Sequence, residues 1–126
     1  MRFTTYPIDH HKGMTVLVYE DNLLWSSRLV KSLKALGHVP IVRTKPDSTK
    51  GDADVAIVNL GSDGLEPESL VPALNAQGIH TIGHAGHKET EVLELGRRAG
   101  CTTLATNSQL TFKLENLLAQ VNGGSA

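Results

Sequence analysis

The stretch DVAIVNLG, residues 54–61, is the part of the sequence that decides the fold. Four consecutive apolar residues, 55–58, lie between an acidic residue and an amide. A short, uninterrupted apolar run of this kind predicts a strand that is buried on both faces, as in the middle of a parallel sheet. Asn59 then lies at the carboxyl end of the strand, where ligands and chemistry collect in open parallel sheets. What an amide can do at that edge therefore bears directly on function.

Expected strands and helices alternate along the rest of the chain. Besides the strand ending at 59, the sequence predicts strands at 15–19, 39–43, 79–84 and 102–105, and helices at 23–36, 66–77, 88–99 and 108–121. Residues 45–53 hold Pro, Gly and polar side chains without a helical period, so the second helix of the series is short or absent. This alternation predicts one α/β domain, a flavodoxin-like, doubly wound, five-stranded parallel sheet in the order 2-1-3-4-5.

Single residues mark the faces and ends of these elements. In the first helix, apolar residues at spacings of four, four and three predict a stripe that faces the sheet: Trp25, Leu29, Leu33 and Leu36. Gly37 and Gly100 follow helices in the position of a left-handed cap. Ser108 is expected to cap the last helix. Pro40 places the second strand at an edge of the sheet, where a missing N–H does no harm.

Length and composition indicate a single cytoplasmic domain. We assign the core to residues 14–121 of the 126, between an N-terminal extension, 1–13, and a flexible tail or cut linker, 122–126. The 12 basic and 13 acidic residues give no global field to attract nucleic acid or an anionic membrane. No apolar run is long enough for a transmembrane span or a signal peptide. Cys101 is the only cysteine, which excludes an internal disulfide and fits a reducing compartment.

Three short segments resemble a known family. They are LVYEDN at 17–22, the strand that ends at Asn59, and RRAGC at 97–101. Together they resemble the receiver domain of bacterial response regulators, of the chemotaxis type, over roughly residues 14–121. The most specific parts are the acidic pair after the first strand and the Ala-Gly before the last strand. The resemblance implies a domain of two-component signal transduction with the same five-stranded fold.

The family resemblance also implies an aspartyl-phosphate switch. In the family an acidic pair holds Mg²⁺, an aspartate ends the third strand and takes the phosphoryl group, a Ser or Thr ends the fourth strand, and a lysine ends the fifth. Glu20 and Asp21 match the acidic pair, but Asn59 stands where the aspartate is expected. An amide is not an appreciable nucleophile at neutral pH, and its lack of charge weakens a magnesium site. We therefore expect no enzyme activity, no cofactor, and weak or absent Mg²⁺ binding.

The two remaining positions of the switch are also altered. Counting back from Ala99 and Gly100 places Ala85 at the hydroxyl position, and a slip of one residue would bring in His84. Counting forward places Asn107 at the lysine position. Alanine cannot hydrogen-bond a phosphoryl oxygen, and an asparagine supplies no cation to offset transferred charge. Glu20, Asp21, Asn59, Ala85 and Asn107 thus form a degenerate phosphorylation site.

The expected function is that of a pseudo-receiver, an atypical response-regulator domain in signal transduction. It would act through phosphorylation-independent protein–protein interaction or through dimerisation. Surfaces expected from the family are the helix at 88–99, the strand at 102–105 and the last helix. A further surface is the sheet face left open by the missing second helix, which would expose part of the first two strands. The expected partners are proteins, with a homodimer as one option, and neither nucleic acid nor a membrane.

An alternative is a sensor for a small ligand or a metal at the carboxyl edge of the sheet. Imidazole and carboxylate together suit zinc, nickel or cobalt, and the candidate ligands are Glu20, Asp21, His84 and His87. The spacing of these residues is outside the familiar zinc patterns. His10 and His11 belong to a polar tail and are expected to be solvated. A residual phosphotransfer domain is the third option, although Asp63 reads as a turn residue and not as a substitute acceptor.

Overall fold

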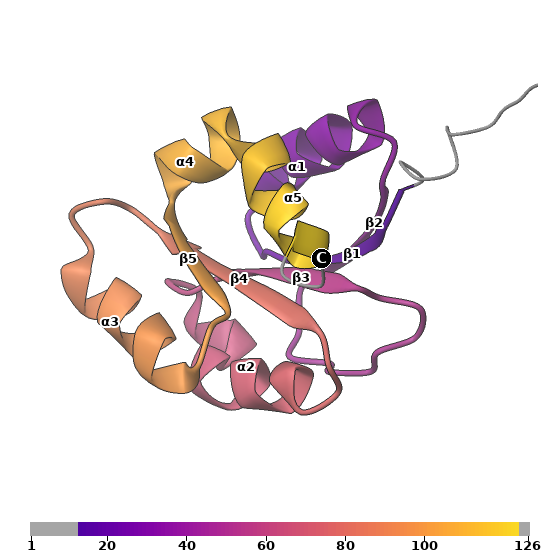
Figure 1. Ribbon diagram of the computed structural model, residues 1–126. Helices are drawn as coiled ribbons and strands as arrows, with labels where there is room; N and C mark the ends of the chain where they lie inside the picture. The colour runs from indigo at the N-terminus through magenta and orange to yellow at the C-terminus, as the bar shows by residue number, and fades with distance from the viewer. Residues whose placement is uncertain (1–12, 124–126) are drawn as a thin grey trace, which may run out of the picture.

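Five parallel strands form one sheet in the order β2-β1-β3-β4-β5 (Figure 1). The computed structural model describes residues 13–123. Its elements are β1 (Thr15–Tyr19), α1 (Leu23–Ala35), β2 (Val39–Arg43), β3 (Val55–Asn59), a 3-10 turn (Asp63–Leu65), α2 (Pro67–Asn75), β4 (His80–Ala85), α3 (Thr90–Ala99), β5 (Thr103–Thr106), α4 (Asn107–Phe112) and α5 (Leu114–Gly123). The predicted class, strand count and strand order are confirmed.

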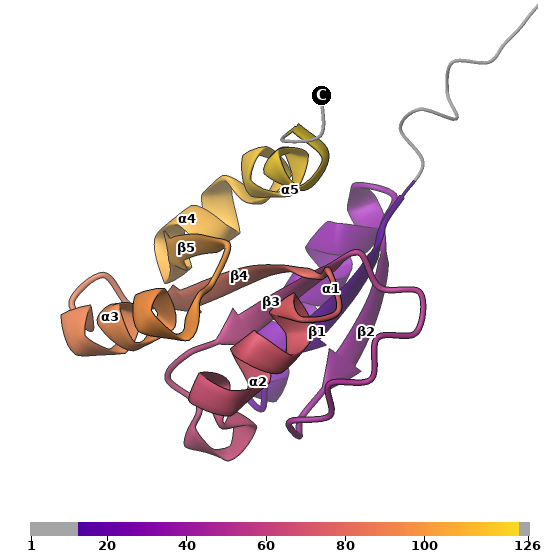
Figure 2. The ribbon, with the colours of Figure 1, turned by 60° about the horizontal axis from the view of Figure 1, so that its bottom comes forward.

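Helices cover both faces of this sheet. The helices α1, α4 and α5 lie on one face, and α2 and α3 lie on the other (Figure 2). Strand residues alternate between the two cores: Val16 and Val18 of β1 join the α1 side, whereas Leu17 and Tyr19 join the α2 side. Residues 55–58 of β3 have no exposed surface, as expected for a strand buried on both faces.

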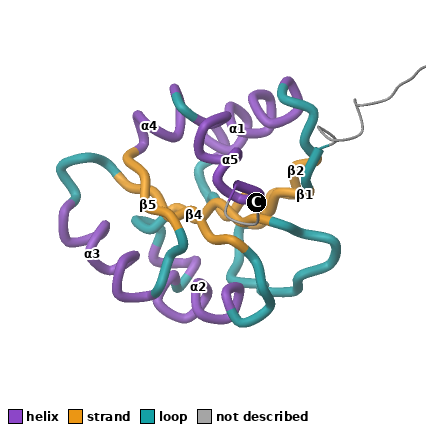
Figure 3. The backbone as a smooth tube through the Cα atoms, in the orientation of Figure 1, coloured by secondary structure: helices purple, strands orange, loops and turns teal. Residues whose placement is uncertain are grey.

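The link between β2 and β3 has no helix (Figure 3). It folds back over β1 instead, because the Tyr19 hydroxyl donates to the carbonyl oxygen of Asp47. Arg43 Nη1 donates to the Tyr19 hydroxyl at 2.9 Å and to the Asp47 carbonyl at 2.7 Å. Leu17 and Tyr19 are consequently fully buried. The prediction that the open face exposes β1 is therefore wrong.

The exposure predicted for the second strand is present. Val39 and Ile41 of β2 are 55% and 42% exposed. The backbone of β2 bonds β1 through Val39 N, which donates to Met14 O at 2.9 Å, and Arg43 O, which accepts from Glu20 N at 3.1 Å. In a parallel ladder every second residue of an edge strand points its backbone groups outward, here residues 40 and 42. Pro40 is one of these, so its missing N–H leaves the ladder intact and hinders strand addition at this edge.

The last helix is divided, which the sequence did not indicate. Lys113 interrupts it between α4 and α5, and α4 begins after Thr106. Thr106 Oγ1 accepts from Gln109 N at 3.1 Å, while Gln109 Oε1 accepts from Thr106 N at 2.8 Å, a reciprocal capping box. The prediction that Ser108 caps the helix is wrong, because Ser108 lies inside α4. The apolar residues still face the sheet as predicted, with Leu110, Leu114 and Leu117 buried.

Both ends of the predicted domain arrangement lie largely outside the described residues. The extension at 1–13, with His10 and His11, falls there except for Gly13, and so does the end of the tail, 124–126. Residues 122 and 123 belong to α5, so that helix continues two residues past the predicted end of the core. None of the helices in residues 13–123 combines the length and the apolar character that crossing a membrane requires.

Candidate functional site

Four polar side chains meet at the carboxyl edge of the sheet: Glu20 after β1, Asn59 at the end of β3, His84 in β4, and Asn107 after β5. Parallel pairing brings them together, since Asn59 is directly opposite His84 and the strands end at the same edge. Each continues the alternating set that faces α1, namely Val16 and Val18, Val55 and Ile57, Ile82, and Ala105. The site therefore lies at the end of the α1-side core.

Asn59 uses its whole amide group within the site. Its Nδ2 donates to Glu20 Oε1 at 3.1 Å and to Glu20 Oε2 at 2.9 Å. Its Oδ1 accepts from Gly61 N at 3.0 Å. The opposite amide orientation would set a carbonyl oxygen against the carboxylate and an N–H group against a donor, so these contacts fix the orientation. The amide thus acts as a strut between β3 and Glu20.

Glu20 is fully buried and needs these donors. Its exposed fraction is 0%, and besides Asn59 it accepts from Asn22 N at 3.1 Å. A buried carboxylate is tolerated when N–H groups satisfy its oxygens. The same Asn22 caps α1, because its Oδ1 accepts from Trp25 N at 3.0 Å. Glu20 is therefore tied to the start of α1 as well as to β3.

His84 is buried beside this pair, with 1% of its surface exposed. Its Nδ1 lies 2.7 Å from Asn107 Oδ1, which can only accept, so Nδ1 carries the hydrogen of the neutral ring. Nε2 has no hydrogen-bond partner and lies 3.9 Å from Glu20 Oε1. Burial lowers the pKa of His84, while the Asn107 hydrogen bond and the charges of Glu20 and Glu89 act in the opposite direction. The neutral ring is thereby favoured.

Of the two positions considered for the hydroxyl, His84 is the one that reaches Glu20. Its neighbour Ala85 ends β4, is 1% exposed and carries no polar group. Successive strand residues point to opposite faces, and the β4 residue that shares a face with Asn59 is His84. The Trp25 ring lies against the same histidine, with ring centroids 6.0 Å apart. Trp25 is partly buried at the margin of the core, as the spacing on α1 indicated.

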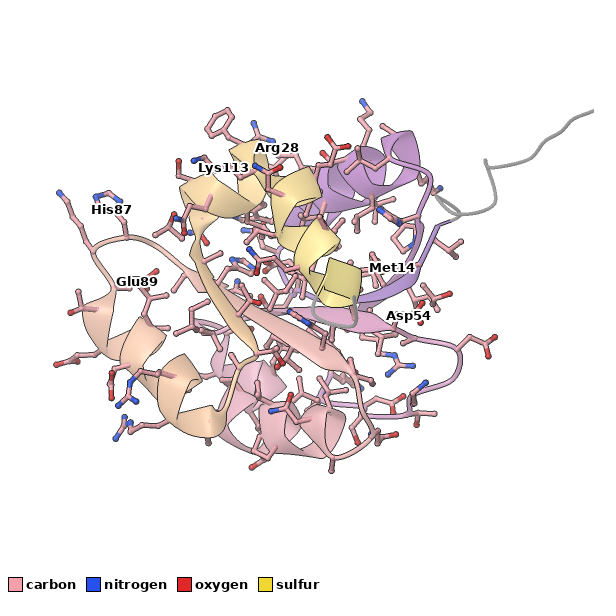
Figure 4. The ribbon with its side chains drawn as sticks, in the orientation of Figure 1. Met14, Arg28, Asp54, His87, Glu89 and Lys113 are labelled. Atoms are coloured by element: carbon pink, nitrogen blue, oxygen red, sulfur yellow. The ribbon has the colours of Figure 1, made fainter. Side chains whose placement is uncertain are left out.

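The candidate metal ligands do not converge. Asp21 is exposed and accepts a hydrogen bond from the Ser62 hydroxyl, while His87 is exposed on the loop between β4 and α3 (Figure 4). Residues 13–123 include no group of three His, Cys, Asp or Glu side chains arranged to hold a metal ion. Both oxygens of Glu20 already face N–H donors. The residues present therefore do not fit the magnesium site of the receiver family without rearrangement.

Glu89 belongs to this edge but was not among the predicted residues. It precedes α3, and its Oε1 accepts from Gly86 N at 2.7 Å (Figure 4). Its charge also acts on the buried ring of His84. Its place in the first turn of the helix predicted at 88–99 was a sequence signal for it, since acidic residues favour helix N-termini.

The thiol of Cys101 is not expected to react at this edge of the sheet. Burial raises the pKa of its thiol to about 11, so the thiol stays protonated at neutral pH. The side chain packs at the margin of the α2-side core. Cys101 therefore behaves as a small, partly buried apolar residue.

The sequence matches no protein-family model and no curated protein. Solved structures do match. The chemotaxis response regulator CheY4 of Vibrio cholerae has a TM-score of 0.73 at 16% identity, covering 87% of this chain and 99% of that chain. The isolated REC domain of RcsB from Salmonella enterica serovar Typhimurium has a TM-score of 0.70 at 18% identity, covering 89% and 90%. NtrX from Brucella abortus reaches a TM-score of 0.77 at 16% identity, covering 90% of this chain and 28% of that chain.

Identities this low establish the fold and not the chemistry. The matched regions cover nearly all of the described residues and agree with the sheet order found above. This chain has the receiver-domain fold of the response regulators.

Proposed function

We propose that this chain is a pseudo-receiver, a signal-transduction domain that acts by binding proteins without being phosphorylated. The observation that carries the proposal is the hydrogen bonding of Asn59 to both oxygens of Glu20 at the carboxyl end of β3. That edge is where the receiver family places its phospho-accepting aspartate. Here an amide occupies it, and an amide is not an appreciable nucleophile toward phosphorus, because its nitrogen lone pair is delocalised into the carbonyl group.

The surroundings of Asn59 support the same reading. Transfer of a phosphoryl group adds negative charge, which a cation or hydroxyl group must offset. In residues 13–123, the one basic side chain within 4 Å of Glu20 is His84, at 3.9 Å, and burial keeps its ring neutral. Asn107 is engaged with the other nitrogen of the same ring. Most polar groups of the crevice thus bond one another, and His84 Nε2 is left without a hydrogen-bond partner among the described residues.

The proposed mode of action is protein binding, and the outer faces of the domain are available for it. We expect contacts through α3, β5 and the α4–α5 segment, and through β2, whose Val39 and Ile41 are half exposed. Either a different protein or a second copy of the chain would qualify as the partner.

Phosphodonor labelling tests the loss of phosphorylation. The purified chain is incubated with acetyl phosphate and Mg²⁺, and intact mass is measured for the wild type and for Asn59→Asp. We expect neither to gain a phosphoryl group, because the carboxylate restored in the variant still lacks the lysine and hydroxyl partners. Stoichiometric labelling of the wild type would contradict the proposal.

A metal-responsive sensor is the second candidate, and one observation favours it. His84 Nε2 is a buried nitrogen without a hydrogen-bond partner, 3.9 Å from a carboxylate oxygen of Glu20. Nitrogen and carboxylate oxygen are ligands for zinc and nickel. Thermal unfolding with Mg²⁺, Mn²⁺, Zn²⁺ or Ni²⁺ separates the candidates, since a bound metal raises the midpoint. A midpoint that no ion shifts would remove the sensor in its metal form.

A further inference from the structure

A groove of about 360 Å³ runs between α1 and α4. These two helices lie on the face of the sheet opposite α2 and α3 (Figure 2). Its lining residues are Trp25, Arg28, Leu29, Lys31, Ser32, Leu110, Thr111 and Phe112. We call it the α1–α4 groove. Trp25, Arg28, Leu29 and Ser32 recur at helical spacing, so one stripe of α1 forms a whole wall. Most of the lining surface is apolar, with buried Leu29 and Leu110 at its base.

Large apolar side chains are exposed on both helices that form this groove. Phe112, the last residue of α4, is 81% exposed, and Leu23 and Leu24 at the start of α1 are 74% and 72% exposed. Leu23 also lines a second hollow, between α1 and Val42 of β2. Lys31 lines both hollows, so the two hollows are neighbours on the outer side of α1. Contiguous exposed apolar surface marks an interaction site.

The charged side chains that line the groove are basic. Arg28 and Lys31 are the charged residues that line it. The helix α1 carries Arg28, Lys31 and Lys34 and no acidic residue, and α4 has no acidic residue either. Lys113 comes directly after Phe112 and lies on the same side of the molecule as Arg28 (Figure 4). Glu115, in the first turn of α5, is not among the lining residues. This basic surface contrasts with the chain as a whole, which has a net charge of −1.

The form of the groove favours a helical occupant. Both walls are helices whose backbone groups are bonded internally, so an extended peptide would find no strand edge to pair with. A helix satisfies its own backbone and presents side chains at positions i, i+3, i+4 and i+7, which is the pattern that fills a groove between helices. Carboxylates that flank such an apolar stripe would meet Arg28 and Lys31.

We infer that the α1–α4 groove binds an acidic amphipathic helix of a partner protein. The apolar face of that helix packs on Trp25, Leu110 and Phe112, and its carboxylates pair with Arg28 and Lys31. This inference rests on the proposed interaction function and gives it a surface and a partner chemistry. The proposed function and this inference can be contradicted independently, because phosphodonor labelling probes the crevice at Asn59 whereas the experiment below probes the groove.

Selection from a displayed peptide library tests the charge preference. The library holds helices of about 18 residues, a length at which helices become stable in water, with a fixed leucine stripe and flanking positions randomised among Glu, Lys, Gln and Ser. Selection on the full chain is expected to enrich Glu. Selection on Arg28→Glu/Lys31→Glu is expected to enrich Lys, and a matched control, Lys45→Glu/Lys88→Glu, is expected to enrich Glu as the wild type does. Lys45 and Lys88 are exposed and do not line the groove.

Binding to the groove itself is read from fluorescence. Trp25 is the single tryptophan of the chain and lines the groove, so its emission reports occupancy there. Enriched acidic peptides are expected to change this emission saturably and to bind Phe112→Ser about tenfold more weakly. Circular dichroism checks that each variant is folded. Arg28, Lys31 and Phe112 are exposed, so their substitution is expected to leave the fold intact.

Four outcomes would overturn the inference. The first is a selection that enriches flanking residues without any bias in charge. The second is that acidic peptides bind the wild type and Arg28→Glu/Lys31→Glu equally well. The third is that the selected peptides leave the Trp25 emission unchanged. The fourth is tighter saturable binding of a single-stranded oligonucleotide, or of phosphatidylserine-containing vesicles, than of any selected peptide, because it would assign the basic surface to another class of partner.

Discussion

Asn59 and Glu20 join the ends of β3 and β1 through a side-chain amide that donates to both oxygens of a fully buried carboxylate, at 3.1 and 2.9 Å. The hydrogen bonds of this pair have a structural role. It replaces the charge repulsion of two adjoining carboxylates with hydrogen bonds, and it needs no metal ion to hold the strand ends together. At the edge that carries chemistry in many parallel sheets, the Asn59 amide and the Glu20 carboxylate are thus already engaged in hydrogen bonds.

Changing Asn59→Asp is expected to destabilise the fold at neutral pH. The variant removes the donors to Glu20 and sets two carboxylates against each other, at a cost of about 1–3 kcal/mol in the free energy of unfolding. The loss should shrink as the pH falls, because a protonated Asp side chain donates again. Urea unfolding at several pH values measures this, with exposed Asn116→Asp on α5 as the control. A variant as stable as the wild type near neutral pH would mean that the strut is unimportant.

The burial of His84 predicts that acid destabilises the domain. Burial lowers the pKa of His84, so the folded state binds fewer protons than the unfolded state. Stability is then fully present above the unfolded pKa of about 6.5 and is lost as the pH falls from there toward the folded value. Replacing His84→Gln should reduce this pH dependence, whereas exposed His87→Gln should preserve it.

His80 must be considered in that comparison, since burial lowers its pKa too. Its contribution is present in the wild type and in both histidine variants and therefore cancels in the difference. An NMR titration of the His84 ring settles the direction. A value above 6.5 would mean that the ring is charged and paired with Glu20, contrary to the expected neutral form.

Loop 44–54 is expected to depend on the hydroxyl group of Tyr19. Tyr19→Phe removes the hydroxyl that donates to Asp47 and accepts from Arg43. We expect a loss of about 1 kcal/mol in the free energy of unfolding and faster proteolysis at the link between β2 and β3. Limited proteolysis with peptide mapping measures the second effect. Cleavage as slow as in the wild type would show that another contact holds the loop.

Gly96 in α3 is expected to reject alanine, although alanine normally stabilises a helix. A Cβ atom at Gly96 would lie 2.4 Å from Leu60 Cδ1 and 2.9 Å from Leu104 Cδ2. Overpacking of this kind costs about 1–3 kcal/mol, more than the gain in helix propensity of about 1 kcal/mol. Gly64→Ala is the control, because nothing lies within 4 Å of its added Cβ. Thermal unfolding compares them, and a Gly96→Ala variant more stable than wild type would contradict this packing.

The parts of the fold that the sequence predicted are those with a local signal. Continuous apolar runs such as 55–58 identify a central strand, and period-two alternation carries Glu20 and Asn59 to one face of the sheet. The break at Lys113 has no such signal, because the apolar spacing continues through it. The cap at Thr106 was identifiable from Gln109 three residues later, whereas Ser108 is followed by Thr111 at that spacing and fits the capping box less well.

Other features depend on contacts between distant segments. The burial of β1 follows from Tyr19, Arg43 and the main chain of Asp47, and no periodicity encodes such a contact. The sequence left open whether Ala85 or His84 faces the site, because counting along the chain does not resolve a shift of one residue. The pairing of Asn59 with His84 between β3 and β4 shows that His84 does. Glu89 joins the site across the chain as well, since a Cβ atom on Gly61 would lie 3.7 Å from Glu89 Oε2.

The response of the crevice to a phosphodonor is the most direct test of the central claim. Amide NMR spectra of the full chain are recorded with Mg²⁺ before and after addition of acetyl phosphate, following the Gly61 and Gly86 amides beside Asn59 and Glu89. A pseudo-receiver predicts spectra that do not change. Saturable shifts at these amides, accompanied by a phosphoryl adduct on the wild-type chain, would contradict the account.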